Sequence, residues 1–206
     1  MESRDCRMTR TCGCSGVSSR PGANRGVRRP GAGRAAALAA ALAVVLGGCG
    51  TAGTGAAVPP APMSIGSAAF GQNVLPQRYT CHGQKIAPPL EWSGAPPGTK
   101  SIAIVVDDSS APITPYIYWL VFHIGPDATD IQEGSLPTGA RQAANSAGSV
   151  GYDPPCPGAR PHSYRFTVYA LRTMPDLPNG ASLPSVLSAI AAATIGRGRI
   201  VVTGYP

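Results

Sequence analysis

The sequence predicts an all-β domain, an antiparallel β-sandwich with one or two peripheral helices, over residues 63–206. Short segments rich in Val, Ile and Tyr, separated by Gly and Pro turns, fill this region. Strands do not alternate with helices, as they would in a parallel α/β sheet, and one late segment has helical spacing. We therefore expect one domain built around one core.

Five strands are expected, in the ranges 90–92, 101–106, 116–124, 165–171 and 199–204. Residues 102–106 and 120–122 are continuously apolar, which is typical of central strands covered on both faces. From Arg165 onward the side chains alternate between two faces, which places His162 at the mouth of this strand.

One helix is expected near the C-terminus. Ser182 is a favourable N-cap, Pro184 falls in the first turn, and Gly196 is expected to end the helix. Its apolar face consists of Val186, Leu187, Ile190 and Ile195.

Residues 1–48 have the pattern of a bacterial lipoprotein signal peptide. A basic stretch leads into the apolar segment 35–46, which is too short to cross a membrane permanently but fits the h-region of a signal peptide. The segment ends in Leu-Gly-Gly-Cys, which resembles a lipobox, so that Cys49 would be acylated after cleavage. The alternative is an ordinary signal peptide cleaved near Ala52 or Ala57.

The segment 49–62 consists mainly of Gly, Ala, Thr and Pro and carries no charge, which predicts a flexible tether. We therefore expect an exported protein, lipid-anchored to the cell membrane and facing its extracytoplasmic side.

The basic charge of the chain is concentrated in the leader. The whole sequence carries 17 Lys and Arg against 10 Asp and Glu, a net charge of +7. After Cys49 there are nine basic residues against eight acidic ones, a net charge of +1. So little net charge does not support strong binding to nucleic acid, which we exclude as a partner.

Cys81 and Cys156 remain once the leader is removed and Cys49 is acylated. In an oxidising compartment they favour a disulfide that closes a loop of about 75 residues and contributes about 4 kcal/mol; two reduced, buried thiols are the alternative. Zinc bound by these cysteines with His82 and His162 is a weaker alternative, because their spacing matches no standard zinc finger. We expect no metal and no cofactor.

Two segments could supply a site. Asp107 and Asp108 end a strand, and because neighbouring strand residues point opposite ways, at most one of them can face a given pocket. The Pro-rich loop 151–161 leads into His162, and its restricted backbone suits a pocket wall. Two turn-forming aspartates, and a surface turn followed by an incidental histidine, are the alternatives.

Six motifs in order resemble the phosphatidylethanolamine-binding protein (PEBP) family, in its bacterial Raf-kinase-inhibitor-like branch with mycobacterial exported members. They are YTCHG (79–83), IAPPLEWSG (86–94), DDSSAP (107–112), YIYW (116–119), GYDPPCP (151–157) and HSYRFTVYAL (162–171). The resemblance covers about residues 65–205 and implies a PEBP-like β-sandwich with a small pocket for phosphate, acetate or a phosphorylated head group.

The resemblance also implies which residues bind the ligand, and it implies no catalytic residue. Asp108 matches the second Asp of the family's turn, and His162 matches the histidine after the family's Pro-rich loop. A carboxylate near an imidazole is expected to help that imidazole donate to an anionic oxygen. The implied ligand-binding set is Asp108, Ala111, Pro112, Tyr116, Tyr118, Gly151, Pro155 and His162.

Three departures from the family pattern affect this set. Tyr118 stands where the family has histidine, Ser109-Ser110 replaces Pro-Asp, and Asp153-Pro154 replaces Gly-Gly. A neutral hydroxyl thus replaces an ionisable imidazole, and Asp153 adds negative charge. We predict weaker binding of dianionic phosphate than in typical members, with a smaller or less charged ligand favoured.

The expected function is that of a membrane-anchored, non-enzymatic binding protein for small anionic ligands or phospholipid head groups. The enzymatic alternative is a serine hydrolase that uses Ser109 or Ser110 with His162, although the chain lacks the Gly-x-Ser-x-Gly motif. A third alternative is an interaction module that inhibits a protein partner. A homodimer is left open.

Overall fold

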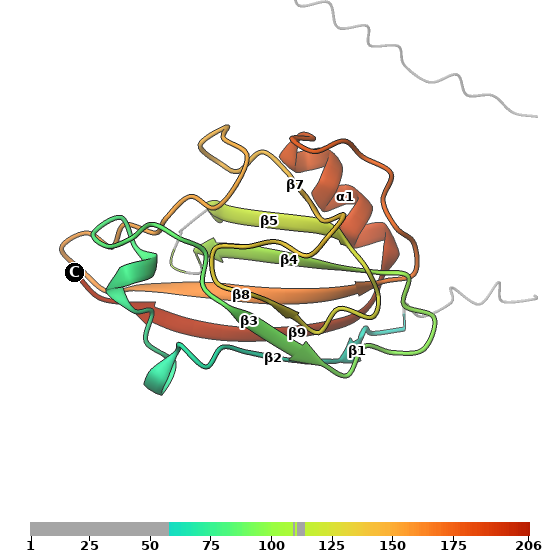
Figure 1. The fold of residues 1–206 in the computed structure, drawn as a ribbon, viewed down its shortest axis with the longest axis horizontal. Coiled ribbons are helices and arrows are strands. Elements are labelled where there is room, and N and C mark those ends of the chain that lie inside the picture. The colour runs from blue at the N-terminus through green and yellow to red at the C-terminus, as the bar shows by residue number, and fades with distance from the viewer. Residues whose placement is uncertain (1–57, 109, 111–113) are drawn as a thin grey trace, which may run out of the picture. The chain divides into compact units, whose positions relative to one another are not determined.

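The computed structural model describes residues 58–108, 110 and 114–206, and these residues form a two-layered β-sandwich (Figure 1). The chain divides into two units, residues 1–53 and 54–206, and the described residues belong to the second. Several predictions fall outside the described residues: the signal peptide at 1–48, the acylated Cys49, and the site residues Ala111 and Pro112.

Within the described ranges, the larger sheet has the strand order β1-β9-β8-β4-β5-β7 and the smaller sheet the order β2-β3-β6. The larger sheet consists of β1 (Ala61–Pro62), β9 (Thr194–Gly204), β8 (His162–Leu171), β4 (Ser101–Asp108), β5 (Ile117–Ile124) and β7 (Arg141–Gln142). The smaller sheet consists of β2 (Ser64–Gly66), β3 (Leu90–Ser93) and β6 (Asp130–Ile131). Paired strands are antiparallel except β1 and β9. The predicted antiparallel β-sandwich is confirmed.

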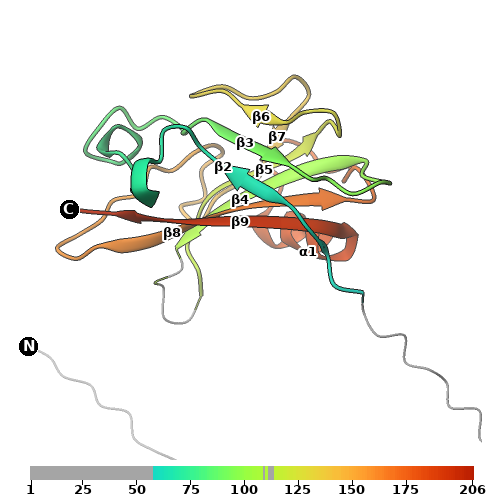
Figure 2. The same cartoon turned by 90° about the horizontal axis from the view of Figure 1, so that it is seen from below.

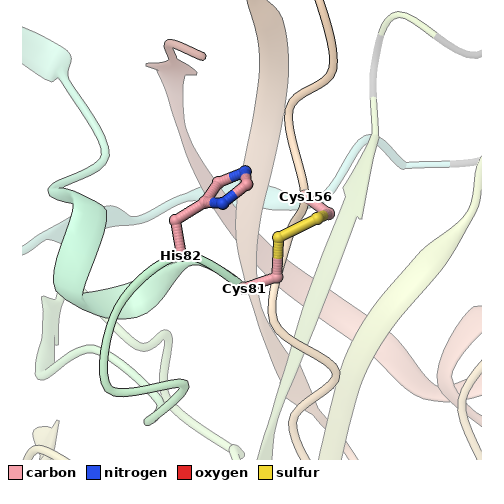
Figure 3. Close-up of side chains that lie close together, drawn as sticks. All are labelled: Cys81, His82 and Cys156. Carbon is pink, nitrogen blue, oxygen red and sulfur yellow. A yellow bond between two sulfur atoms is a disulfide. The ribbon is translucent and has the colours of Figure 1, made fainter.

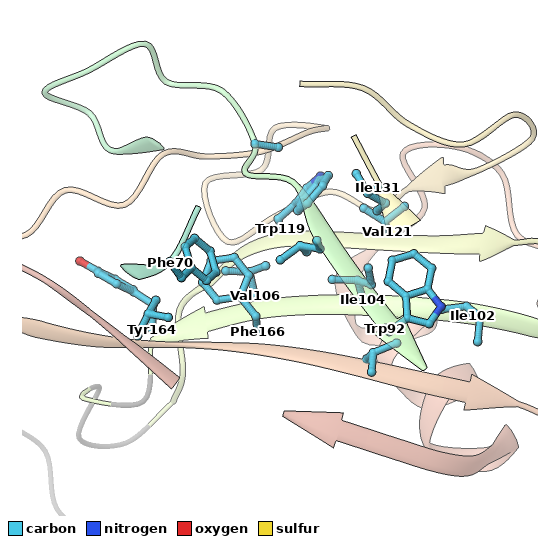
Figure 4. Close-up of a cluster of buried hydrophobic side chains, with 14 of the residues drawn as sticks. Phe70, Trp92, Ile102, Ile104, Val106, Trp119, Val121, Ile131, Tyr164 and Phe166 are labelled. Carbon is cyan, nitrogen blue, oxygen red and sulfur yellow. The ribbon is translucent and has the colours of Figure 1, made fainter. Parts of the chain in front are cut away.

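The main core lies between the two sheets (Figure 4). β8 contributes Tyr164, Phe166, Val168 and Ala170 to it, because alternate residues of a strand share a face. Opposite them, Trp92 of β3 is buried and its indole N–H donates a hydrogen bond to the Ala128 carbonyl (2.9 Å). The pairing of β4 with β8 is unbroken from Ser101–Leu171 to Asp108–Tyr164, so these two strands form a rigid centre for the sheet.

The helix α1 (Leu183–Ala193) covers part of the outer face of the larger sheet and buries Val186, Ile190 and Ala193. The prediction that it extends to Gly196, with Ile195 on its apolar face, is wrong, because Thr194 is already extended and begins β9. Gly196 does not end the helix but allows Pro96 to pack closely against the backbone of β9, because a Cβ at this position would lie 2.7 Å from Pro96.

Two single-turn 3-10 helices, η1 (Gly71–Asn73) and η2 (Gln77–Tyr79), lie between β2 and β3. β1 occupies the last two residues of the range 49–62 that was expected as a tether, and it pairs with β9 at Gly196 and Arg197. The described chain therefore enters the sandwich beside the first half of β9.

Candidate functional site

The structure places Asp108 and His162 in direct contact at one end of the larger sheet. Asp108 is the last residue of β4 and His162 the first of β8, and the antiparallel register brings these two ends together. His162 Nδ1 lies 2.9 Å from Asp108 Oδ2, with side-chain exposures of 39% and 8%. A carboxylate accepts hydrogen bonds, so Nδ1 carries the proton of this contact, and Nε2 can donate to an anion when the ring is the imidazolium.

Asp107 points to the other face of the sheet, as expected for a neighbour of Asp108 in a strand. Its carboxylate accepts two hydrogen bonds from Arg165, one of 3.0 Å from Nη2 to Oδ2 and one from Nε. This ion pair is partly buried and raises the pKa of Arg165, chiefly through the hydrogen bonds. Asp107 is thus a structural residue, and Asp108 is the aspartate of the candidate site.

A β-bulge brings Tyr118 to the site. β4 pairs Val106 with Trp119 but Asp107 with Ile117, so Tyr118 is an extra residue in β5. A bulge re-aims the side chain of its extra residue. The Tyr118 ring lies 4.7 Å from that of Tyr116 and packs edge-on against Tyr164 at 5.5 Å.

Tyr164 forms the floor beneath His162. The two rings are nearly parallel, with centroids 6.3 Å apart. Tyr164 lies at the edge of the core with its hydroxyl pointing away from it (Figure 4). That hydroxyl is buried and meets no partner at ordinary hydrogen-bond geometry among the described residues, but it lies close enough to the Tyr118 hydroxyl for a hydrogen bond between the two to affect the pKa of both. Buried polar atoms in proteins are nearly always partnered, so Tyr118 is the natural partner of this hydroxyl.

Asp153 closes the site from the Pro-rich loop. Its carboxylate accepts a hydrogen bond of 2.7 Å from the Tyr116 hydroxyl, and its backbone N–H donates to the Tyr118 carbonyl at 2.9 Å. The loop is therefore tied to the start of β5 at two points.

The site tyrosines are neutral donors at physiological pH. Burial, followed by the hydrogen bond to Asp153, raises the pKa of Tyr116 to about 12. Burial, followed by the negative charges of Asp108 and Asp153, raises the pKa of Tyr118 to about 12. Burial also raises the pKa of Tyr164. Two carboxylates, one imidazole and three neutral hydroxyls thus lie together at this end of the larger sheet.

A disulfide holds the Pro-rich loop in place. Cys81 and Cys156, 75 residues apart in sequence, are joined with a Cα–Cα distance of 5.1 Å (Figure 3). The Cys81 N–H also donates to the Pro155 carbonyl at 3.0 Å. Pro155 therefore anchors the loop through its backbone.

His82 lies beside this disulfide, and its ring nitrogen and the two sulfurs lie within 4.8 Å of one another. The two sulfurs are bonded to each other, so the thiolates that zinc requires are absent while the disulfide is intact. His162 is not a member of this group.

Gly151 has a φ of 124°, a conformation that residues with a Cβ rarely adopt, and its carbonyl accepts a hydrogen bond from Asn145. It lines a cavity of about 310 Å³ together with Trp119 and Tyr152. Of the predicted set, the structure thus brings together Asp108, His162, Tyr116 and Tyr118, whereas Gly151 lines a neighbouring cavity.

Ser110 takes part in the turn after β4. Its N–H donates to Asp108 Oδ1 at 2.7 Å, and its hydroxyl accepts from the Ser163 N–H at 3.0 Å. No hydrogen bond between the Ser110 hydroxyl and His162 is found in the described part of the chain, and Ser109 lies outside it. This geometry gives the serine hydrolase alternative no support.

Tyr164 and Asp153 are site residues that the predicted set lacks. Tyr164 could have been found from its position, because it shares a strand face with His162 two residues earlier. The sequence shows Asp153 as an added charge, but its hydrogen bond to Tyr116 depends on how the loop folds.

The fold and the site define the class of protein. The family model for phosphatidylethanolamine-binding protein matches residues 66–205, and the chain belongs to this family. A UPF0098 protein of Methanothermobacter thermautotrophicus is 42% identical over 132 residues, which cover 62% of this chain and 87% of the relative. LppC of Mycobacterium tuberculosis, named as a candidate lipoprotein, is 38% identical over 184 residues, which cover 79% of this chain and 91% of LppC.

Solved structures agree with this assignment. Escherichia coli YbcL, described as a new member of the mammalian PEBP family, is 30% identical with a TM-score of 0.65 and covers 70% of this chain and 98% of YbcL. CT736 of Chlamydia trachomatis, described as a candidate PEBP homologue, is 31% identical with a TM-score of 0.62 and covers 70% of this chain and 97% of CT736. None of these four relatives is named as an enzyme. In the described part of the chain, no helix is both long and apolar enough to cross a membrane.

Proposed function

We propose that this protein is a lipid-anchored binding protein that holds a small anionic ligand at the Asp108–His162 site and does not transform it. The observation that carries the proposal is the hydrogen bond from His162 Nδ1 to Asp108, which orients the imidazole and leaves its second nitrogen for a ligand.

The charges around the site favour a ligand of low charge. Asp108 and Asp153 are both carboxylates, while His162 is the one ionisable cation among the described residues of the site. A dianion would be repelled by two carboxylates in a partly dry environment, where electrostatic interactions are stronger than in water. A carboxylate or a phosphate monoester that also carries an amino group therefore fits better than inorganic phosphate.

The membrane anchor is supported by sequence. The Leu-Gly-Gly-Cys motif ending at Cys49 is the expected acylation signal, and the similar protein LppC is named as a candidate lipoprotein. Export and an extracytoplasmic location follow from this anchor.

Titration calorimetry with acetate, inorganic phosphate and O-phosphoethanolamine tests the binding function. We expect His162→Ala to weaken binding at least tenfold, because the imidazole that would contact the anion is lost. The matched control is His123→Asn, since His123 lies near the other end of β5 in a positive-φ conformation that Asn tolerates. Equal affinity in the wild type and the His162 variant would overturn the proposal.

Two further measurements bear on the same site. A Tyr118→His change is expected to tighten phosphate binding, because it introduces an ionisable donor; micromolar phosphate binding unaffected by this change would contradict the low-charge preference. Mass spectrometry of each ligand after long incubation should show it unaltered. Hydrolysis that disappears in Ser110→Ala would support the hydrolase instead.

A further inference from the structure

The anion site and the entry of the chain lie at opposite ends of the larger sheet. Asp108 and His162 lie where β4 ends and β8 begins, which we call the site end. β1 pairs with β9 at Gly196 and Arg197, near the opposite end of β8 (Figures 1 and 2). Ten residues of β8 separate the two ends, a length of roughly 30 Å.

Basic side chains gather on the half of the larger sheet where the chain enters, from the middle of β8 onward. Lys100 and Arg172 directly adjoin β4 and β8 there: the Lys100 N–H donates to the Leu171 carbonyl, and the Arg172 N–H to the Ala193 carbonyl. Arg197 is the register partner of Tyr169, and Arg199 is the partner of Thr167. We call these four exposed residues, Lys100, Arg172, Arg197 and Arg199, the basic end.

The basic end is largely free of counter-charges. Of the nine basic residues after Cys49, Arg78, Arg141 and Arg165 form ion pairs with described carboxylates. No such pair is found within the described part of the chain for any member of the basic end. Two carboxylates lie on loops near this end: Asp176, which pairs with Arg141, and Asp127, which follows β5.

The opposite end has a different charge. Asp107, Asp108 and Asp153 lie there, with Arg165 paired to Asp107 and His162 to Asp108. The exposed Arg160 precedes His162 by two residues, and the exposed Lys85 lies on the loop that the disulfide joins to the site loop. Acidic and basic residues are thus balanced at the site end, and the excess of positive charge lies at the basic end. Such a charge distribution orients a protein near a charged surface even when its net charge is small.

The tether limits how far the basic end can lie from the bilayer. Eleven residues, 50–60, separate the expected acylation site Cys49 from β1, and their composition predicts a flexible chain. A flexible chain of this length has a mean span of roughly 20 Å. This is shorter than β8, so the end at which the chain enters is kept close to the lipid surface.

We propose that the basic end rests on anionic phospholipid of the anchoring membrane and holds the Asp108–His162 site away from it, open to water-soluble ligands. This inference rests on the lipid anchor and anion-binding site proposed above. The partner surface is an anionic bilayer, because each basic side chain near such a surface strengthens the attraction about fivefold. Head groups in the same bilayer then cannot reach the site. The ligand is a soluble phosphate monoester or carboxylate, not an intact phospholipid of that membrane.

The two lysines of the sequence report the two ends separately. Lys100 belongs to the basic end, whereas Lys85 lies in the loop after η2, which the Cys81–Cys156 disulfide fixes to the site loop. The lipidated full chain is reconstituted in vesicles of phosphatidylcholine alone or mixed with phosphatidylglycerol, and pulsed with an acetylating N-hydroxysuccinimide ester. We expect acetylation of Lys100 to slow at least fivefold on the anionic vesicles, with Lys85 unchanged. Equal slowing of both lysines, or slowing of Lys85 alone, would overturn the proposed orientation.

Matched variants identify the cause. Arg197→Gln/Arg199→Gln is expected to bring the reactivity of Lys100 on anionic vesicles to within about twofold of its value on neutral ones, because two of the attracting charges are lost. Lys85→Gln/Arg160→Gln removes the same charge from other exposed positions and should leave Lys100 protected. If Lys100 stayed protected in Arg197→Gln/Arg199→Gln and lost its protection in Lys85→Gln/Arg160→Gln, the basic end would not be the surface that contacts the lipid.

The ligand's source is tested on the same vesicles. The affinity for O-phosphoethanolamine on anionic vesicles should match that of the unanchored domain within about twofold, and phosphatidylethanolamine added to the vesicles should not compete. Competition by the lipid would overturn the inference. If O-phosphoethanolamine and acetate bind neither form, the proposed function fails, while the lysine measurement still decides the orientation.

Discussion

The hydroxyl of Tyr116 donates a hydrogen bond of 2.7 Å to the carboxylate of Asp153, across 37 residues of sequence. This contact joins the start of β5 to the Pro-rich loop and places a negative charge at a position where the family pattern has glycine. It makes the site more rigid and, at the same time, less attractive to anions.

Asp153→Asn separates these two effects. The amide oxygen can still accept the hydrogen bond from Tyr116, but the charge is removed, so phosphate binding should tighten about tenfold. Calorimetry measures this change. The control is Asp127→Asn, the same substitution on an exposed loop near the other end of the sheet, which should alter the affinity less than twofold. An unchanged or weaker affinity in Asp153→Asn would contradict the repulsion.

Stability should fall in alkaline solution. Tyr116 and Tyr118 have a pKa of about 12 in the folded protein, against about 10 in the unfolded chain. Their contribution to the free energy of unfolding is therefore complete below pH 10 and is lost as the pH rises from 10 to 12, because the unfolded state releases these protons first. Urea unfolding at pH 8, 10 and 11 measures the loss. Tyr118→Phe should show a smaller loss; an identical slope would show that Tyr118 is not responsible.

Removal of the disulfide should cost about 4 kcal/mol of unfolding free energy, since the bond closes a loop of 75 residues in the unfolded chain. Cys81→Ser/Cys156→Ser, compared with the wild type in urea, measures this cost. Anion affinity should also fall, because the bond fixes the loop that carries Asp153. A reducing agent should weaken the wild type and leave the double variant unchanged; sensitivity of both proteins would point to another cause.

Gly204 allows the site to pack closely. A Cβ at this position would lie 2.6 Å from Cε2 of Tyr164, so Gly204→Ala should displace that ring and cost about 1–3 kcal/mol. A Cβ at Gly158, in the site loop, would meet nothing within 4 Å. Gly158→Ala is therefore the control and should retain stability and anion affinity. Equal behaviour of the two variants, measured by thermal unfolding and calorimetry, would contradict the close contact.

The central strands were predictable from the sequence because their residues determine them locally. β4 is a continuous apolar run, which indicates a strand buried on both faces. β8 alternates between two kinds of side chain, which indicates a strand whose two faces lie in different surroundings. The opposite directions of Asp107 and Asp108 also follow from strand geometry alone. The strands β1, β6 and β7 are only two residues long and are defined by their pairing with neighbouring strands, so no local sequence pattern predicts them.

The candidate site was predictable only in part. The motifs indicate Asp108 and His162, but their hydrogen bond depends on the register of β4 with β8. The bulge that presents Tyr118 depends on how β5 pairs with β4, and its residues carry no Gly or Pro to mark it. The prediction that the helix ends at Gly196 is wrong because a glycine fits two different roles. It is common after a helix C-terminus, but here it allows the close contact with Pro96.

The disulfide also has a consequence for resistance to proteolysis. A single proteolytic cut anywhere between Cys81 and Cys156 would leave two fragments still joined by the covalent sulfur bridge. The halves could then stay folded around their shared strands. Nicking at an exposed loop in this range would therefore not release the C-terminal half.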